Sequence, residues 1–233
     1  MAKLSKRYKK SLEKRQAKQY KLPDAVEALK SFERAKFVES VDLAFCLNLD
    51  TTQSDQVVRG TVSLPHGTGK DVKVAVFSKS VSETDATKAG ADFVGADDLM
   101  EKVKGGWLGF DVAVATPDMM KDLSKLGKIL GPKGLMPSPK AGTVTTDVLR
   151  TVKEIKKGKV EYKVDKAGNV HLSIGKISFE SKQLVENAQA VIEAVSHAKP
   201  SSVKGSFIKS ISLSATMSPS VRLDVAEFVV IEE

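Results

Sequence analysis

The chain has 233 residues and a formal net charge of +8, with 41% hydrophobic and 28% charged residues, a composition typical of a globular protein. Its single cysteine, Cys46, excludes an intramolecular disulfide and a thiolate metal cluster within one chain, and it is most simply a small core residue. No apolar stretch is long enough to span a bilayer, and no apolar segment follows the basic N-terminus as in a signal peptide. We therefore expect a cytoplasmic protein with no membrane partner.

The first 21 residues contain nine basic residues and one acidic residue, so this segment, which we expect to be flexible, accounts for the whole positive excess. A second basic cluster, residues 150–176, has eight basic and three acidic residues, whereas residues 83–101 are acidic. A solubilising tail would explain the first cluster but not the second. The charge distribution therefore favours a polyanionic partner.

The next segment predicts one helix and two strands. The helix begins at Leu22, has proline at its first helical position, and shows apolar residues at helical spacing to about residue 35. Alternating apolar residues predict a half-buried strand over residues 41–49 and another over roughly 57–64. The sequence Pro-His-Gly-Thr-Gly at 65–69 then ends this pattern.

A different pattern runs from about residue 71 to residue 157. Short, continuous apolar runs at 72–77, 91–95 and 111–116 alternate with helical segments. We expect helices at about residues 82–90, 96–104, 117–130 and 145–157. Strands without a polar face that alternate with helices indicate a parallel sheet covered on both sides.

Alternating strands return after Gly158. Residues 160–164 and 170–174 flank a turn and predict a hairpin, and an amphipathic helix follows over about 181–198. The helix and strands predicted at either end of the chain cannot bury their apolar faces by themselves. We therefore predict that the two ends form one domain together.

The predicted fold class is α+β combined with α/β. A split α+β sandwich domain, residues 1–66 and 159–233, carries an inserted Rossmann-like, three-layer α/β domain, residues 67–158. The two chain crossings form a double hinge, with Pro65, His66, Gly67 and Gly158 as the hinge residues.

The strand within residues 206–221 is the most informative element. It buries Ile211, Leu213 and Ala215 on one face. The other face carries the hydroxyls of Ser210, Ser212, Ser214 and Thr216. Each hydroxyl both donates and accepts hydrogen bonds, so this row suits the phosphate oxygens and 2′-hydroxyls of RNA; a solvated polar sheet face is the alternative.

Catalysis, a cofactor and a metal have no positive evidence in the sequence. The sequence HGTGK at 66–70 fails the phosphate-loop pattern, which needs a glycine in place of Leu64 and a hydroxyl residue in place of Asp71. The three histidines, His66, His171 and His197, are far apart and have no metal-ligand spacing. We therefore predict that the protein is not an enzyme.

The segment GPKGLMPSPKAGTV at 131–144 contains three prolines and three glycines, which fix a rigid, non-helical path from which Lys133 and Lys140 project. A loop that only joins two helices is the alternative, but loops of this length are usually functional or disordered.

Together with this loop, four further segments resemble the bacterial large-subunit ribosomal protein L1 family. They are AKFVESVDL at 35–43, SDQVVRGTVSLPHGTGK at 54–70, HLSIGK at 171–176 and SLSATMSPSV at 212–221. The resemblance covers nearly the whole chain in the right order. It implies a split domain with an inserted Rossmann-like domain. The positions of the two chain crossings predict the same organisation independently.

The resemblance also implies a function. Proteins of this family are constituents of the large ribosomal subunit and are monomeric when free. They bind a helical junction of large-subunit (23S) ribosomal RNA. They form the mobile stalk that assists release of deacylated tRNA from the exit site. They also act as translational repressors by binding their own operon mRNA.

The RNA-contacting positions implied by the matching motifs lie in the split domain. They are Lys36, Phe37, Glu39, Ser40, His171, Ser173, Gly175, Lys176, Ser210, Ser212, Ser214, Thr216, Met217 and Ser218. For Phe37, a core role is the alternative. The sequence departs from the family pattern at Lys133, Ser138 and Ser218; the family has glycine at the last position, which puts the local backbone geometry in doubt.

Two alternatives to an RNA-binding protein remain at this point. One is a hinged two-domain nucleotide-dependent enzyme, which stoichiometric binding of folded RNA without nucleotide would exclude. The other is a basic DNA-binding module, which competition by equimolar duplex DNA would support.

Overall fold

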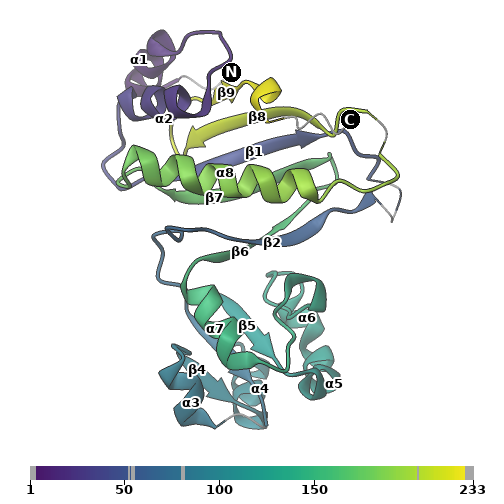
Figure 1. Ribbon diagram of the computed structural model, residues 1–233. Helices are drawn as coiled ribbons and strands as arrows, with labels where there is room; N and C mark the ends of the chain where they lie inside the picture. Colours follow the sequence, from purple (N-terminus) through teal and green to yellow (C-terminus); the bar gives the residue numbers. More distant parts are fainter. Residues whose placement is uncertain (1–3, 52, 54–55, 80–81, 204, 229–233) are drawn as a thin grey trace. The chain divides into compact units, whose positions relative to one another are not determined.

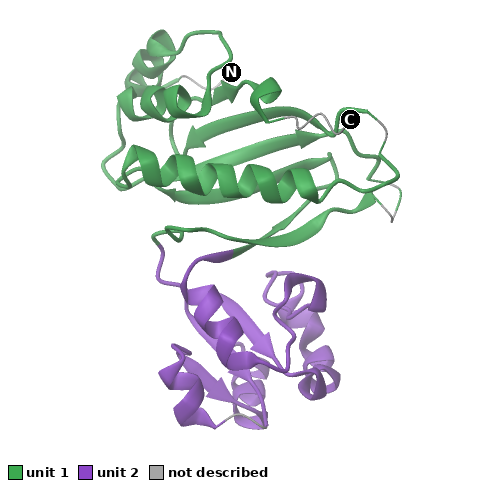
Figure 2. Cartoon of the chain, viewed as in Figure 1, with its two compact units in different colours: residues 1–69, 160–233 green, residues 70–159 purple. Residues whose placement is uncertain are grey.

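The computed structural model describes residues 4–51, 53, 56–79, 82–203 and 205–228 (Figure 1). The chain forms two compact units (Figure 2): unit 1 consists of Met1–Gly69 and Val160–Glu233, and unit 2 of Lys70–Lys159. The boundaries predicted from the sequence follow residues 66 and 158. That the split domain folds by itself stays a prediction.

Unit 1 contains a four-stranded sheet in the order β7-β1-β8-β9, and each neighbouring pair is antiparallel. Its strands are β1 (Ser40–Leu47), β7 (Asn169–Lys176), β8 (Ile208–Ala215) and β9 (Val221–Leu223). Burial alternates along β1 and along most of β8, because every second side chain faces the core. The helices α2 (Leu22–Ser31) and α8 (Ser181–His197) pack together on that core face.

The predicted hairpin after residue 158 is wrong in its pairing. The strand β6 (Lys159–Lys163) forms a two-stranded sheet with β2 (Arg59–Ser63). Among the described residues, the predicted pairing with β7 is reduced to one isolated bridge, between Val164, just after β6, and Val170. The Tyr162 side chain explains this choice. It is buried, and its hydroxyl donates to the carbonyl of Ala194 in α8 at 3.1 Å. The sheet of β2 and β6 therefore packs on α8.

Unit 2 contains a parallel sheet in the order β4-β3-β5. The strands are β3 (Val74–Phe77), β4 (Phe93–Gly95) and β5 (Val112–Ala115). The helices α3 (Glu83–Lys88) and α7 (Val148–Lys156) cover one face, and α4 (Asp97–Lys104) covers the other. The predictions of a three-layer α/β arrangement here and of a mixed fold overall are confirmed.

The predicted helix over 117–130 is interrupted. Four short helical segments replace it: η2 (Pro117–Met119), α5 (Met120–Leu123), η3 (Ser124–Leu126) and α6 (Gly127–Leu130). Polar and glycine residues at the junctions account for the breaks, since the Ser124 hydroxyl donates to the Met120 carbonyl at 2.7 Å and Gly127 lowers helix propensity. A further 3-10 turn, η4 (Pro139–Ala141), lies within the 131–144 loop.

Two elements at the chain ends were not predicted. The expected flexible basic segment forms the helix α1 (Lys6–Lys14), whose N-cap Ser5 accepts a hydrogen bond from the Tyr8 N–H. A short 3-10 turn, η5 (Val225–Glu227), follows β9. Lys3 of the basic N-terminal segment and residues 229–233 lie outside the described residues. None of the helices built from the described residues is long and apolar enough to cross a membrane.

Candidate nucleic-acid interface

The candidate interface is the outer face of the four-stranded sheet, the face away from α2 and α8. Directly opposite side chains in antiparallel strands point to the same face, so the register shows which residues share it. Asp42 lies between Ser173 and Ser214. Ala44 lies in the same way between His171 and Ser212. The predicted hydroxyl row of β8 is therefore continued by polar residues of β7.

The outer face also includes residues that the sequence analysis missed or misassigned. Cys46 lies between Asn169 and Ser210 and is half-buried, so its assignment to the core was wrong. Arg222 of β9 lies opposite Ser212. Counting by twos along β1 would have placed Asp42 and Cys46 on this face. The pairing of β9 has no comparable signal, because three residues show too little alternation.

A β-bulge brings Lys176 onto the outer face. Val41 pairs with Gly175, but the next residue of β1, Asp42, pairs with Ser173, so Ile174 has no directly opposite partner. The extra residue reverses the alternation, and Lys176 pairs with Ser40 instead of turning into the core. Gly175 has φ of 149°, and a Cβ at this position would lie 3.0 Å from the Phe179 ring. Gly175 is buried, so it shapes the surface through its backbone.

Ser40, Thr216 and Lys176 form one corner of the outer face. The Ser40 N–H donates to the Thr216 hydroxyl oxygen at 3.0 Å, and the Thr216 N–H donates to the Ser40 carbonyl at 3.0 Å. The Lys176 ammonium donates to the Ser40 hydroxyl at 2.9 Å. The Thr216 hydroxyl therefore also closes the end of the β1–β8 pair, while its side chain stays exposed.

Three large apolar side chains are exposed near this corner. Phe37, Val38 and Met217 are 54%, 56% and 52% exposed, and they lie within three residues of Ser40 or Thr216 in the sequence. A core role for Phe37 is thereby excluded. Exposed apolar side chains beside hydroxyl and ammonium groups suit a partner that offers both flat base or sugar surfaces and phosphate.

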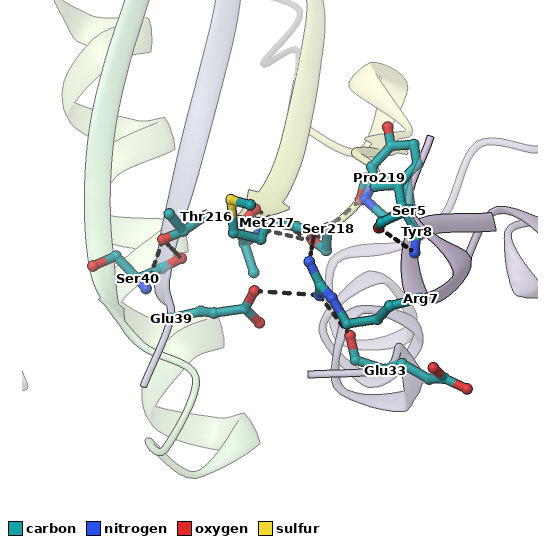
Figure 3. A network of polar contacts seen from close by, with 11 residues as sticks. Ser5, Arg7, Tyr8, Glu33, Glu39, Ser40, Thr216, Met217, Ser218 and Pro219 are labelled. Carbon is teal, nitrogen blue, oxygen red and sulfur yellow. Dashed lines mark hydrogen bonds and ion pairs between the residues drawn. The ribbon is translucent and has the colours of Figure 1, made fainter. Parts of the chain in front are cut away.

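The corner is connected to α1 through Arg7 (Figure 3). The Arg7 guanidinium donates from Nη1 to the Glu33 carbonyl at 2.9 Å and from Nη2 to the Met217 carbonyl at 2.8 Å. Its Nη1 lies 3.7 Å from the Glu39 carboxylate, whose side chain is only 3% exposed. Sequence reasoning missed Arg7, since its contact with Met217 spans 210 positions.

Ser218, at a position where the resemblance implies a glycine, has an internal role. Its backbone is outside the left-handed region, as is that of every described residue other than glycine. Its hydroxyl oxygen accepts a hydrogen bond from the Ala215 N–H at 3.0 Å, and its own N–H donates to the Ala215 carbonyl at 3.1 Å. The turn after β8 is therefore formed without strain, and the doubt about its backbone geometry is resolved.

The predicted positions differ in their accessibility. Those with exposed side chains are Lys36, Phe37, His171, Thr216 and Met217. Those with half-buried side chains are Ser40, Ser173, Lys176, Ser210, Ser212, Ser214 and Ser218. Glu39 and Gly175 are buried. Twelve of the fourteen therefore offer surface to a partner, and the other two lie beneath it.

The predicted hinge residues of the first crossing lie inside unit 1. The Asn187 side chain of α8 accepts a hydrogen bond from the His66 N–H at 3.0 Å and donates to the Gly67 carbonyl at 3.0 Å. Unit 1 continues to Gly69, and Gly158 lies in unit 2. Because the buried Asn187 side chain holds His66 and Gly67, the chain leaves unit 1 only after these two residues.

Unit 2, taken by itself, carries the 131–144 loop, whose Lys133 and Lys140 are exposed as predicted. The loop ends at Val144, which bridges to Ala115 and so extends the parallel sheet.

Within the described residues of both units, no three His, Cys, Asp or Glu side chains are grouped as a metal site would require.

A comparison with known families matches residues 29–219 to the ribosomal protein L1p/L10e family. The chain belongs to this family. It is 51% identical over 213 residues to the large ribosomal subunit protein uL1 of Chlamydia trachomatis serovar D, covering 91% of this chain and 92% of that protein. It is 53% identical over 211 residues to the protein of the same name from Chlorobium phaeobacteroides, with the same coverage.

The L1p/L10e match includes all fourteen predicted RNA-contacting positions. It begins within α2, so α1 and Arg7 precede it, and it ends before β9. The outer face is thus built from matched residues of β7, β1 and β8, Arg222 of β9 adds to it from beyond the match, and Arg7 supports its corner from α1.

Proposed function

We propose that this protein is a constituent of the large ribosomal subunit and binds large-subunit ribosomal RNA with the outer face of unit 1. Membership of a ribosomal protein family supports the first part. The observation that supports the second most strongly is the hydroxyl-rich face formed by β7, β1 and β8, bordered by exposed Phe37 and Met217.

The chemistry of this face suits structured RNA. Serine and threonine hydroxyls donate to and accept from 2′-hydroxyls, which line the wide, shallow minor groove of an A-form helix. Lys36 and Lys176 neutralise phosphates, and Phe37 and Met217 pack on sugars or unstacked bases. A B-form DNA duplex has no 2′-hydroxyls, so the same face gains less from DNA.

The finer functions form part of the proposal. The RNA is a helical junction, unit 1 anchors the protein there, and unit 2 swings as part of the mobile stalk that assists release of deacylated tRNA. The same face binds a similar structure in the protein's own operon mRNA and so represses translation. One surface for two RNAs implies that they compete.

A filter-binding experiment with transcribed 23S ribosomal RNA tests this proposal. We expect stoichiometric binding without nucleotide, displacement by the operon mRNA, and no displacement by equimolar duplex DNA. Footprinting of the bound RNA then identifies the junction. Displacement by duplex DNA at equimolar concentration would favour a general DNA-binding module instead, and a requirement for ATP or GTP would favour a nucleotide-dependent enzyme.

A further inference from the structure

Arg7 joins three separate segments of unit 1. It lies on α1, and its two terminal nitrogens donate to the backbone carbonyl of Glu33, before β1, and to that of Met217, after β8. These acceptors are 184 positions apart in the sequence. A guanidinium presents its donors in a fixed fork, so both bonds together define the separation of the two segments.

The buried carboxylate of Glu39 adds a charge to this arrangement. Its Oε1 has no hydrogen-bond partner within the described residues, and the nearest cation is the Arg7 guanidinium at 3.7 Å (Figure 3). A buried, unpaired carboxylate is costly, so Glu39 favours conformations in which Arg7 stays beside it. Arg7 is itself only 24% exposed, since the surrounding segments cover it.

The two segments that Arg7 joins are the ones that carry the corner of the candidate interface. Residues 33–40 include Phe37 and Ser40, and residues 216–219 include Thr216 and Met217. The contacts between Ser40 and Thr216 lie directly between them. The distance between the exposed Phe37 and Met217 side chains therefore depends on how these segments are held together.

We propose that Arg7 is a positioning residue, which holds the residue 33–40 segment and the 216–219 turn in the geometry that RNA requires. Arg7 acts on RNA affinity through these segments and makes no phosphate contact of its own. This inference rests on the proposed function of the outer face. It gives α1 a role other than that of a basic tail.

The test compares Arg7→Gln with Lys9→Gln, in the full-length protein and with transcribed 23S ribosomal RNA as the probe. Both changes remove one positive charge from α1, but Lys9 is exposed. We expect Arg7→Gln to weaken binding about tenfold or more at fixed salt, because two hydrogen bonds and a charge pair are lost. Lys9→Gln should weaken binding less.

Salt dependence separates positioning from direct contact. A lost phosphate contact lowers the slope of log affinity against log salt by about 0.7 to 0.9. We expect Arg7→Gln to leave this slope unchanged. Arg7→Lys should behave like Arg7→Gln, because a single ammonium cannot form the fork. A lowered slope for Arg7→Gln, or full rescue by lysine, would overturn the inference.

Amide hydrogen exchange makes the test independent of overall stability. In Arg7→Gln we expect the Ser40 N–H, which bonds to the Thr216 hydroxyl, to exchange faster, while amides in the centre of β1 keep their protection. Uniformly faster exchange would mean that Arg7 supports only the general fold, and the inference would fail. If the protein without any substitution does not bind the RNA, the proposed function itself is wrong. If it binds the RNA and Arg7→Gln binds equally well, only the inference about Arg7 is wrong.

Discussion

The two sheets of this protein use their faces differently. The antiparallel sheet of unit 1 buries one face under α2 and α8, and its other face carries hydroxyl, carboxamide and charged side chains. The parallel sheet of unit 2 is covered on both faces, and Val74, Val76 and Phe77 are fully buried. A sheet of the first kind has a whole face for a partner, whereas the second leaves only loops and helix surfaces.

This difference bears on where we expect each unit to recognise RNA. In unit 1, the candidate groups lie on strands, where the register fixes their spacing. In unit 2, the exposed groups noted from the sequence, Lys133 and Lys140, lie on a loop. We therefore expect the specific binding of ribosomal RNA to belong to unit 1.

The largest expected effect comes from separating the units. A chain of residues 1–69 joined to residues 160–233 should bind 23S ribosomal RNA with nearly the affinity of the full protein, because all fourteen candidate positions lie within it. Residues 70–159 alone should bind it only non-specifically. Gel-shift titrations at one salt concentration compare them, and specific binding by unit 2 alone would reverse the assignment.

The next effect separates the two faces of β8. Leu213→Ala should lower the free energy of unfolding by about 2–5 kcal/mol, because Leu213 is fully buried. The neighbouring Ser212→Ala should leave stability within about 0.5 kcal/mol and weaken RNA binding instead. Chemical denaturation and filter binding on both variants measure this contrast. Equal effects on stability would mean that the outer face is part of a packed core.

At the corner of the outer face, Thr216→Val should affect both properties. It removes a proposed hydrogen-bond partner for RNA, so affinity should fall by about 1–3 kcal/mol. It also removes the acceptor of the Ser40 N–H, so stability should fall by about 1 kcal/mol. Thr216→Ser, which keeps the hydroxyl, is the matched control and should restore most of both. A stability loss without any loss of affinity would restrict Thr216 to an internal role.

The smallest effect is expected at Ser218. Ser218→Gly removes the acceptor of the Ala215 N–H and adds backbone freedom, so stability should fall by about 0.5–1.5 kcal/mol. RNA affinity should hardly change, since the hydroxyl is used within the turn. Ser218→Ala separates the hydroxyl from the backbone effect. A marked loss of affinity at unchanged melting temperature would show that RNA recruits this hydroxyl.

Local patterns predicted the elements whose burial follows a regular period. The strand around Leu43, the helix around Ala188 and the inner face of β8 were all found in this way. The hairpin failed because Tyr162 packs against α8, a contact that no local pattern encodes. The long helix over 117–130 failed because hydroxyl and glycine residues at its junctions outweigh its apolar spacing.

The sequence was sufficient to predict the hydroxyl row of the candidate interface. It was not sufficient to predict the residues that hold this surface in shape. Period-two spacing placed Ser212 and Ser214 outward. The bulge at Ile174 reverses the alternation, and only the pairing with β1 reveals it. The contact of Arg7 with Met217 depends on two distant segments of the chain, so it appears only after the chain has folded.

The central claim is that the outer face of unit 1 binds large-subunit ribosomal RNA, and equilibrium binding by Ser212→Glu tests it most directly. Ser212 lies in the middle of this face, opposite Arg222, so we expect the folded protein to tolerate a carboxylate there. Facing phosphate, that carboxylate should reduce affinity for 23S ribosomal RNA by about a hundredfold or more at an unchanged melting temperature. The control Ser124→Glu, an exposed hydroxyl position in unit 2, should bind within about twofold of the unaltered protein. Unaltered binding by Ser212→Glu would contradict the assignment of the interface to this face.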